Sequence, residues 1–331
     1  MSKLAKFVTA AMLMATPVLA EDTVTLKYSS FLPAATVNNA LSAPALVAKA
    51  DELSGGTLKI ELYPGGSLVS GGEVQLKLVQ DGVADIAEIP IPYTPGRISG
   101  LDVFELPNLA KSNSDGALAS IKLIEDGLIG GMDDLVALGM LQSGPYYIHT
   151  KDPIEGLADL RGLKLRVSGK TQAQIVSRLG AVPVSNIAAN AMAENVSRGL
   201  IDGALVDTGN LYNFGVGDLL KYHVTNLPLG SFAVLFGMSK ARYDSLPEQA
   251  KSAIDQIKGE WYTTELGRNM DQQTADVTAR LEAAGDHHFV ELSAEDLAHA
   301  DEVLAEVAED WEARSDANPA ILAAARAALG M

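Results

Sequence analysis

Short runs of alternating apolar and polar residues recur along the chain. Between them lie stretches whose apolar residues repeat at every third or fourth position. The alternating runs TVTLKYSSF (23–31), TLKIELYPGG (57–66) and DIAEIPIP (85–92) predict β-strands. The stretches from Asn39 to Leu53 and from Gly72 to Gln80 separate these runs and predict helices. Such alternation of strand and helix is typical of an α/β domain with a largely parallel sheet.

The same alternation starts again in the second half of the chain. A helical pattern runs from Ala188 to Arg198, and strand patterns occupy LVALGMLQSGPYYIHT (135–150), LKLRVSG (163–169), AVPVS (181–185) and GLIDGALVD (199–207). This is a second α/β unit of similar size. No flexible linker rich in serine and glycine divides the two units. We therefore expect strands to cross between them more than once.

The predicted domain boundaries follow from these crossings. Domain I takes residues 21–145 plus 228–255, and domain II takes residues 146–227 plus 256–331. A proline-free run with helical spacing extends from Pro247 to Gly285. It is either one long C-terminal helix of about 35 residues, roughly 50 Å in length, or two shorter helices that break near Gly267.

The first residues carry an export pattern. Lys3 and Lys6 precede an apolar run that reaches Met14, and the small residue Ala20 stands before an acidic pair. Residues 1–20 therefore predict a cleaved signal peptide and a location in the periplasm. A membrane anchor is the alternative, but the apolar run is shorter than the roughly 20 residues that cross a bilayer.

Net charge narrows the kinds of partner. The formal net charge is −17 at pH 7. Because such a surface repels phosphate backbones and anionic lipids, we expect neither nucleic acid nor a membrane surface as a partner. An anionic small ligand then needs its own local cationic site.

Catalytic motifs are weak. The chain has no cysteine, which excludes disulfides and thiolate chemistry. It also lacks the G-x-S-x-G, H-E-x-x-H and P-loop motifs. The adjacent His287 and His288 would point to opposite faces of a strand, which favours a solvated strand end over a metal site. We expect no enzyme activity, no metal and no cofactor.

One cation lies where α/β folds bind their ligands. In RGLKLRVSG (161–169) apolar and polar residues alternate, Arg166 falls on the polar side, and Gly169 ends the run. The carboxyl end of a strand is the usual place for a ligand in such folds. A guanidinium can hold a carboxylate through two parallel hydrogen bonds. Position alone leaves a second interpretation open, a solvent-facing ion pair with a surface carboxylate.

Four segments together resemble a known family. They are LSGGTLKIELYPGGSLVSGGEVQLKLVQDGVADIAE (53–88), DLRGLKLRVSG (159–169), LGAVPV (179–184) and GLIDGA (199–204). In order and spacing they are similar to the substrate-binding proteins of tripartite ATP-independent periplasmic (TRAP) transporters, of the dicarboxylate-binding type. The resemblance implies a two-domain periplasmic solute-binding fold with a central ligand cleft. It also implies that Arg166 clamps the ligand's carboxylate between the domains.

The chain departs from this family's pattern in two places. Asp207, in IDGALVDTGN (201–210), stands where relatives usually have a cleft asparagine. An acid there suits a hydroxyl or an amine better than a second carboxylate, so we expect a monoanion as the ligand. Ser185 and Asn186 replace a proline-rich turn of the relatives, and they are candidates to line the cleft.

The segment IPIPYTPGRISGLDVFELP (89–107) resembles a branch of the family that carries Y-T-P-G-R-F. Its prolines and glycine predict a tight loop at the carboxyl end of a strand, facing the same cleft. The loop offers Tyr93 to pack on the ligand's apolar body, with Thr94 beside it. Arg97 is a candidate second cation, or a solvated arginine of a surface turn.

Several further aromatic residues are candidates for the cleft. Alternation directs Tyr147 and His149 to one face of a strand and Tyr146 to the other. Tyr147 either packs at the hinge or contacts the ligand. Phe31 and Phe232 belong either to the wall of the cleft or to the core.

Together these patterns predict a receptor for an organic acid, an aromatic, hydroxy or keto monocarboxylate. We expect a monomer that closes on its ligand and delivers it to small and large TRAP membrane subunits. Two alternatives stay open. One is an extracytoplasmic enzyme that acts on a carboxylate with Asp207 or His149 as general base. The other is a ligand-binding subunit that serves a sensor protein.

Overall fold

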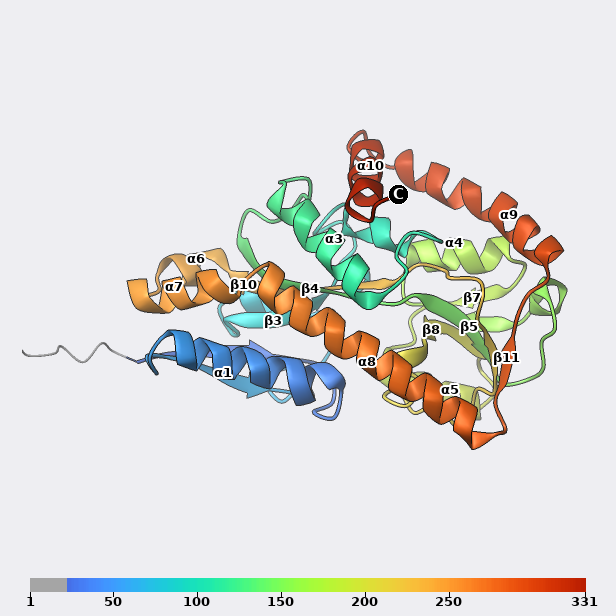
Figure 1. The fold of residues 1–331 in the computed structure, drawn as a ribbon, viewed down its shortest axis with the longest axis horizontal. Coiled ribbons are helices and arrows are strands. Elements are labelled where there is room, and N and C mark those ends of the chain that lie inside the picture. Colours follow the sequence, from blue (N-terminus) through green and yellow to red (C-terminus); the bar gives the residue numbers. More distant parts are fainter. Residues whose placement is uncertain (1–22) are drawn as a thin grey trace, which may run out of the picture.

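The computed structural model describes residues 23–331, so the predicted signal peptide, residues 1–20, lies outside the described residues. Two sheets follow one another along the longest axis of the molecule, with helices on their faces (Figure 1). No helix within residues 23–331 has both the length and the apolar character needed to cross a membrane.

The first sheet has five strands in the order β2-β1-β3-β10-β4. Their bounds are β1 Val24–Ser29, β2 Leu58–Tyr63, β3 Ile86–Pro90, β4 Leu135–Ser143 and β10 Phe232–Ser239. Strand β1 pairs in parallel with β2 and β3, whereas β10 is antiparallel to both of its neighbours. The predicted, largely parallel sheet is therefore correct except for β10.

The second sheet has six strands in the order β11-β9-β5-β8-β6-β7. Their bounds are β5 Tyr146–Thr150, β6 Lys164–Arg166, β7 Val182–Val184, β8 Gly203–Asp207, β9 Tyr222–Val224 and β11 His288–Val290. Only β5 runs against its neighbours. The chain passes to this sheet between β4 and β5 and returns to the first sheet between β9 and β10. We expected such repeated crossings because the sequence has no flexible linker between the two units.

Helices cover both sheets. The α-helices are α1 Ala43–Leu53, α2 Gln75–Gln80, α3 Asn113–Glu125, α4 Lys170–Arg178, α5 Met192–Ser197, α6 Lys240–Asp244, α7 Glu248–Ile257, α8 Glu260–Ala284, α9 Ala294–Glu312 and α10 Asn318–Ala328. A π-helical turn, η1 (Asn38–Ser42), precedes α1. The 3₁₀ turns are η2 Ile91–Tyr93, η3 Leu101–Glu105, η4 Leu157–Leu160, η5 Ala189–Ala191 and η6 Thr208–Asn210.

The long helical run near the C-terminus breaks at a different glycine from the one predicted. Gly259, between α7 and α8, has a φ of 74°, which side chains with a Cβ rarely adopt. Gly267 lies inside α8, where an added Cβ would stand 2.7 Å from Ser114 Cα. This glycine thus permits close packing on α3 instead of ending a helix. The 25 residues of α8 span roughly 37 Å and run obliquely past both sheets (Figure 1).

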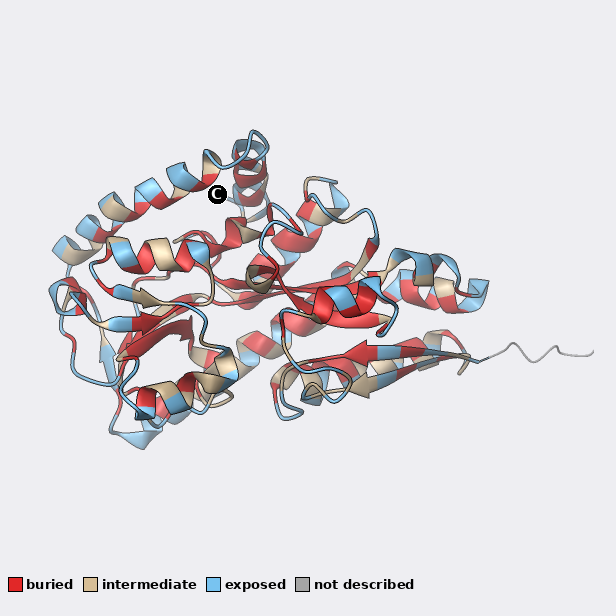
Figure 2. Cartoon of the chain, turned by 180° about the vertical axis from the view of Figure 1, so that it is seen from behind, coloured by how far each residue is buried: buried red, intermediate tan, exposed pale blue. Residues whose placement is uncertain are grey.

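The buried apolar residues of both sheets belong to one core. Figure 2 shows buried residues concentrated on the strands and on the helix faces turned toward them. Leu26 and Ile86 are fully buried in the first sheet, and Ile148 and Leu205 are fully buried in the second. Helices α8 and α10 both contact α3, and α9 contacts α4. The C-terminal helices therefore pack on elements of both predicted domains, and the boundary at residue 256 stays a prediction.

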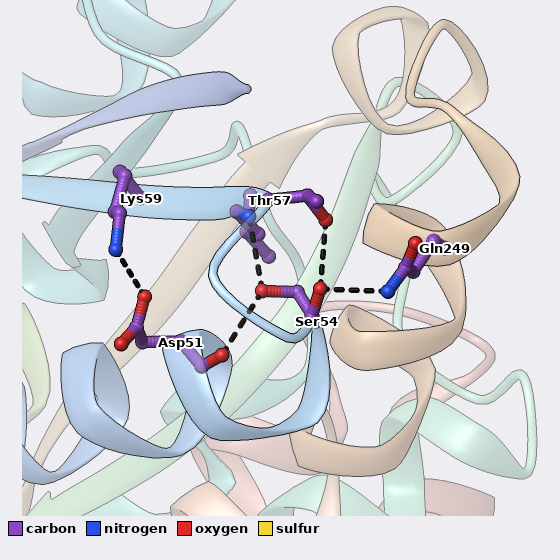
Figure 3. A network of polar contacts seen from close by, with 6 residues as sticks. Asp51, Ser54, Thr57, Lys59 and Gln249 are labelled. Atoms are coloured by element: carbon purple, nitrogen blue, oxygen red, sulfur yellow. Dashed lines mark hydrogen bonds and ion pairs between the residues drawn. The ribbon is translucent and has the colours of Figure 1, made fainter. Parts of the chain in front are cut away.

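A polar network fixes the turn from α1 to β2 (Figure 3). The Ser54 carbonyl accepts hydrogen bonds from the Thr57 hydroxyl at 2.8 Å and from Gln249 Nε2 of α7 at 2.7 Å. Lys59 pairs with Asp51 beside it. The turn thereby connects the first strands of the sheet to α7, through a residue that lies 195 positions further along the chain.

Candidate functional site

The ends of strands from both sheets meet around one cavity. Arg166 ends β6, Ser143 ends β4, and Phe31 follows the end of β1. Tyr146 and Phe232 begin the two reversed strands, β5 and β10. The first residue of a reversed strand lies at the same edge as the carboxyl ends of its neighbours, and Tyr146 pairs with Asp207 and Phe232 with Ser143. Ligands bind at this edge in α/β folds.

The cavity is small and mostly apolar. The space between its lining side chains, including its opening, is about 670 Å³, within the range of small-molecule sites. All of these side chains are buried or half-buried. The lining includes Phe31, Tyr93 and Phe232, whose rings are in contact. The centroid of the Tyr93 ring lies 6.4 Å from the centroid of the Phe31 ring and 5.4 Å from that of the Phe232 ring. Both predicted phenylalanines thus belong to the cavity wall.

Arg166 is buried in this wall, with 2% of its surface exposed. Its Nε donates to the Ile187 carbonyl at 3.0 Å, and its terminal nitrogens donate to the hydroxyls of Ser168 at 3.0 Å and Tyr93 at 3.3 Å. A guanidinium has five N–H donors, so one on each terminal nitrogen is left over. Within residues 23–331 no carboxylate forms an ion pair with Arg166. The alternative of a solvent-facing surface pair is therefore wrong.

Asp207 supports the wall instead of lining it. The carboxylate is 1% exposed and accepts hydrogen bonds from the Ser143 hydroxyl at 2.6 Å and from Asn210 Nδ2 at 3.0 Å. It also accepts from the Asn210 backbone N–H and so caps η6. Burial raises the pKa of Asp207, although these hydrogen bonds act in the opposite direction. Its partners Ser143 and Asn210 are the groups that line the cavity.

Besides Asp207, five of the predicted residues do not line this cavity. Thr94 is buried, and its hydroxyl donates to the carbonyls of its own turn. Arg97 is exposed on the outer surface, near Gln80. Tyr147 is half-buried and points away from the cavity side of β5, while Ser185 and Asn186 are exposed.

Sequence reasoning missed several polar groups of the cavity. Tyr146, which alternation had separated from Tyr147, is the tyrosine of this pair that lines it. Asn210 lines it three residues beyond the position that the family pattern marked. Glu88 and Asn38 also line it, although nothing in their strand and helix patterns set them apart. The strand-end position was a usable signal for Tyr146, but it was not one for Asn38.

Three histidines form a chain of contacts in the second sheet unit. His149 Nδ1 lies 2.8 Å from His223 Nδ1, and His223 Nε2 lies 2.8 Å from His287 Nδ1. The chain ends at the Val206 carbonyl, 3.2 Å from His149 Nε2, and at Lys221 Nζ, 3.2 Å from His287 Nε2. His287 is thus buried, which corrects the prediction of a solvated strand end. That prediction holds for His288, which is exposed.

The histidine chain accounts for His149 without catalysis. A carbonyl only accepts and an ammonium only donates, so all four bonds are satisfied by neutral rings that donate in one direction. Burial lowers the pKa of His149 to about 4. The ring does not line the cavity and therefore lacks the access to ligand that a general base needs.

Comparisons with known proteins agree with this geometry. The family model of bacterial extracellular solute-binding proteins, family 7 (DctP), matches residues 32–314. The chain is 24% identical over 291 residues to the C4-dicarboxylate-binding periplasmic protein DctP of Rhodobacter capsulatus, covering 84% of this chain and 83% of that one.

Two solved structures are similar over nearly their whole length. A TRAP solute-binding protein specific for aromatic acids, from an unidentified marine microbe, was crystallised with 3-hydroxybenzoate. It shares 28% identity at a TM-score of 0.87, over 94% of this chain and 99% of that chain. A TRAP solute-binding protein of Rhodoferax ferrireducens carries copurified benzoate. It shares 27% identity at a TM-score of 0.85, over 93% of this chain and 98% of that chain.

Two α/β units meet around a cavity that contains a buried arginine, and within residues 23–331 this arginine has no ionic partner. These features define a two-domain protein that binds an anionic small molecule. The chain belongs to the DctP family of bacterial extracellular solute-binding proteins. The predicted resemblance to TRAP substrate-binding proteins is confirmed. Members of this family are binding proteins of transporters, so the prediction that the chain is not an enzyme is also confirmed.

Proposed function

We propose that the chain is the periplasmic substrate-binding subunit of a TRAP transporter and that Arg166 binds the carboxylate of a compact, preferably aromatic, monocarboxylic acid. The proposal rests on the burial of Arg166, which has no ionic partner among the residues that the structure describes. A buried charge is strongly unfavourable unless it is paired. A ligand carboxylate supplies the missing charge, and it can accept from the two N–H groups left over.

The apolar part of the cavity supports the choice of an aromatic acid. Phe31, Tyr93 and Phe232 surround the space with ring faces and edges, and rings pack favourably on one another in such arrangements. Two structural relatives at 27% and 28% identity hold benzoate and 3-hydroxybenzoate. The same chemistry in this cavity would use the guanidinium for the carboxylate and the aromatic side chains for the ring.

Closure of the two units has a physical basis in one contact. The Arg166 side chain comes from the second sheet, and its hydrogen bond at 3.3 Å reaches Tyr93, which follows β3 of the first sheet. A ligand held by Arg166 and packed on Tyr93 would make its full set of contacts only when the units are close. It would therefore favour the closed form. Release to small and large membrane subunits follows reopening, and we expect the receptor to act as a monomer.

Titration calorimetry with benzoate tests the proposal. Arg166→Ala should lose about 2 to 5 kcal/mol of binding free energy, the range for truncating one partner of a buried charge pair. Arg166→Lys should lose most of the affinity, because an ammonium cannot reproduce the two-bond contact of a guanidinium. Arg97→Ala is the matched control, since this arginine is exposed outside the cavity, and it should bind like the parent. Circular dichroism checks folding. Parental affinity in folded Arg166→Ala would refute the role of Arg166.

A further inference from the structure

The cavity contains a second polar cluster, on the wall that the first sheet supplies. Glu88 lies within β3 and is 1% exposed, and Asn38 begins η1 and is 4% exposed. Both line the cavity. The Glu88 carboxylate accepts hydrogen bonds from the Ser30 hydroxyl at 2.5 Å, from the Tyr28 hydroxyl at 3.1 Å and from Asn38 Nδ2. Every partner of this carboxylate is thus a donor.

Two acceptors of this cluster remain available. Asn38 Oδ1 is buried and has no hydrogen-bond partner within residues 23–331, an unfavourable state for a buried acceptor. A carboxylate offers about four lone-pair sites. Three donors occupy three of these sites on Glu88, so one site is left. Within the described residues no ion pair includes Glu88. Burial raises the pKa of Glu88 to about 7, as expected for a carboxyl group without a cation beside it.

This cluster complements Arg166 in chemistry. Arg166 belongs to the second sheet and offers only donors, whereas Glu88 and Asn38 belong to the first unit and offer free acceptors. A ligand whose carboxylate binds the arginine therefore presents its remaining groups to a wall of apolar rings with one acceptor cluster. A hydroxyl group satisfies an acceptor in such a wall, whereas a C–H or an ether oxygen does not.

We propose that Glu88 and Asn38 form a second subsite, which binds a hydroxyl group of the ligand and selects hydroxylated organic acids over their unsubstituted parents. The inference rests on the proposed function, because it assumes that Arg166 holds the carboxylate. Arg166 and the aromatic side chains would bind hydroxylated and unsubstituted acids alike, and Glu88 and Asn38 would distinguish between them.

Calorimetry with a matched set of acids tests the subsite. The probes are benzoate, 3-hydroxybenzoate, 4-hydroxybenzoate and 3-methoxybenzoate. In the parent protein at least one hydroxybenzoate should bind tenfold or more tightly than benzoate. The methoxy acid, which cannot donate, should bind no better than benzoate. Glu88→Gln and Asn38→Ala should each reduce the hydroxyl preference, which is the ratio of the affinity for the hydroxybenzoate to that for benzoate, to less than threefold.

Glu105→Gln is the matched control. Glu105 is also buried, and burial raises its pKa to about 8, but it does not line the cavity. This variant should keep the full hydroxyl preference. If Glu88→Gln does not fold, Asn38→Ala alone decides. Equal affinity of the parent for benzoate and both hydroxybenzoates, or an unchanged preference in the two subsite variants, overturns the inference and leaves the role of Arg166 intact. If the parent binds none of the four acids, the proposed aromatic ligand class fails together with the subsite.

Discussion

Replacing His223 by glutamine should change how the stability of the protein depends on pH. In the folded protein His223 lies between His149 and His287, and burial lowers its pKa to about 2. Protonation of the ring would put hydrogens on both nitrogens, and one of the two neighbouring bonds would then have two donors and no acceptor. The unfolded chain has no such restriction, and its histidine titrates near 6.5.

The sign and size follow from linkage. Below pH 6.5 the unfolded state binds a proton that the native state refuses, so stability is fully present above that pH and is lost as the pH falls. Between pH 7 and pH 5 the loss is about 2 kcal/mol for His223, and it is similar for His149, whose pKa burial lowers to about 4. Buried Glu88 and Glu105, with pKa values raised to about 7 and 8, act in the opposite direction by similar amounts.

The opposing groups make the parent's own pH profile uninformative, so the test compares variants. Urea unfolding at pH 7, 6 and 5, without ligand, gives the free energy of unfolding for the parent, for His223→Gln and for His299→Gln. His299 is exposed on α9 and serves as the control. His223→Gln should be less stable at pH 7, but it should lose at least about 2 kcal/mol less than the parent on going to pH 5.

Parallel profiles for the parent and His223→Gln would refute the reasoning. A separate readout is the tautomer of each ring by nitrogen NMR. The direction of the chain requires the proton on Nε2 of His149 and on Nδ1 of both His223 and His287. Any other set of tautomers contradicts the chain of bonds itself, independently of stability.

Two further predictions concern the scaffold. Gly230 has a φ of 86°, and an added Cβ would stand 2.1 Å from the Glu105 carbonyl oxygen. Gly230→Ala should therefore lower the free energy of unfolding, measured with urea, by several kcal/mol. Gly180 has a φ of 87° with open space around it, so Gly180→Ala should lower it only by the roughly 1 to 2 kcal/mol that the left-handed conformation costs. Equal losses in the two variants would contradict the steric argument. Asp271 of α8 accepts from the backbone N–H groups of Asn113 at 2.8 Å and Ser114 at 3.2 Å, at the start of α3. Asp271→Asn should lower the free energy of unfolding by about 1 kcal/mol. The exposed Asp276→Asn, measured by the same urea unfolding, serves as the control and should lower it by less. Equal losses in the two variants would show that the Asp271 cap does not stabilise the protein.

Position along a strand can be predicted from the sequence, and it identified the correct edge of the sheets. Arg166 ends β6, Phe31 follows β1 and Phe232 begins the reversed strand β10, so all three lie at that edge. Alternation and the adjoining glycine or loop mark these strand ends in the sequence. The direction of side chains in irregular turns has no such periodicity. In the loop after β3, Tyr93 points into the cavity and Arg97 points to the outer surface, and no pattern in the sequence distinguishes the two.

Contacts between residues that strand pairing brings together could not be predicted from the sequence either. His149 faces His223 because β5 and β9 are neighbours in antiparallel register, and His287 lies just before β11, which pairs with β9. The histidines are 74 and 64 residues apart along the chain. Only the strand order of the second sheet brings them together. Glu88 of β3 and Asn38 of η1 are 50 residues apart, and the packing of η1 in the first unit brings them together.

The restriction to a monoanion was predicted from Asp207, but the structure assigns its basis to other groups. The Asp207 carboxylate accepts hydrogen bonds from Ser143 and Asn210 and does not line the cavity. It therefore does not contact the space in which a second ligand carboxylate would lie. Among the cavity side chains within residues 23–331, Arg166 is the only cation and Glu88 the only acid. A second carboxylate on the ligand would therefore have no further cation to pair with, in a cavity whose wall consists largely of apolar side chains and the Glu88 carboxyl. Both are unfavourable surroundings for a buried anion. The expectation of a monoanion is therefore kept, with Glu88 in place of Asp207 as the acid that disfavours a second negative charge.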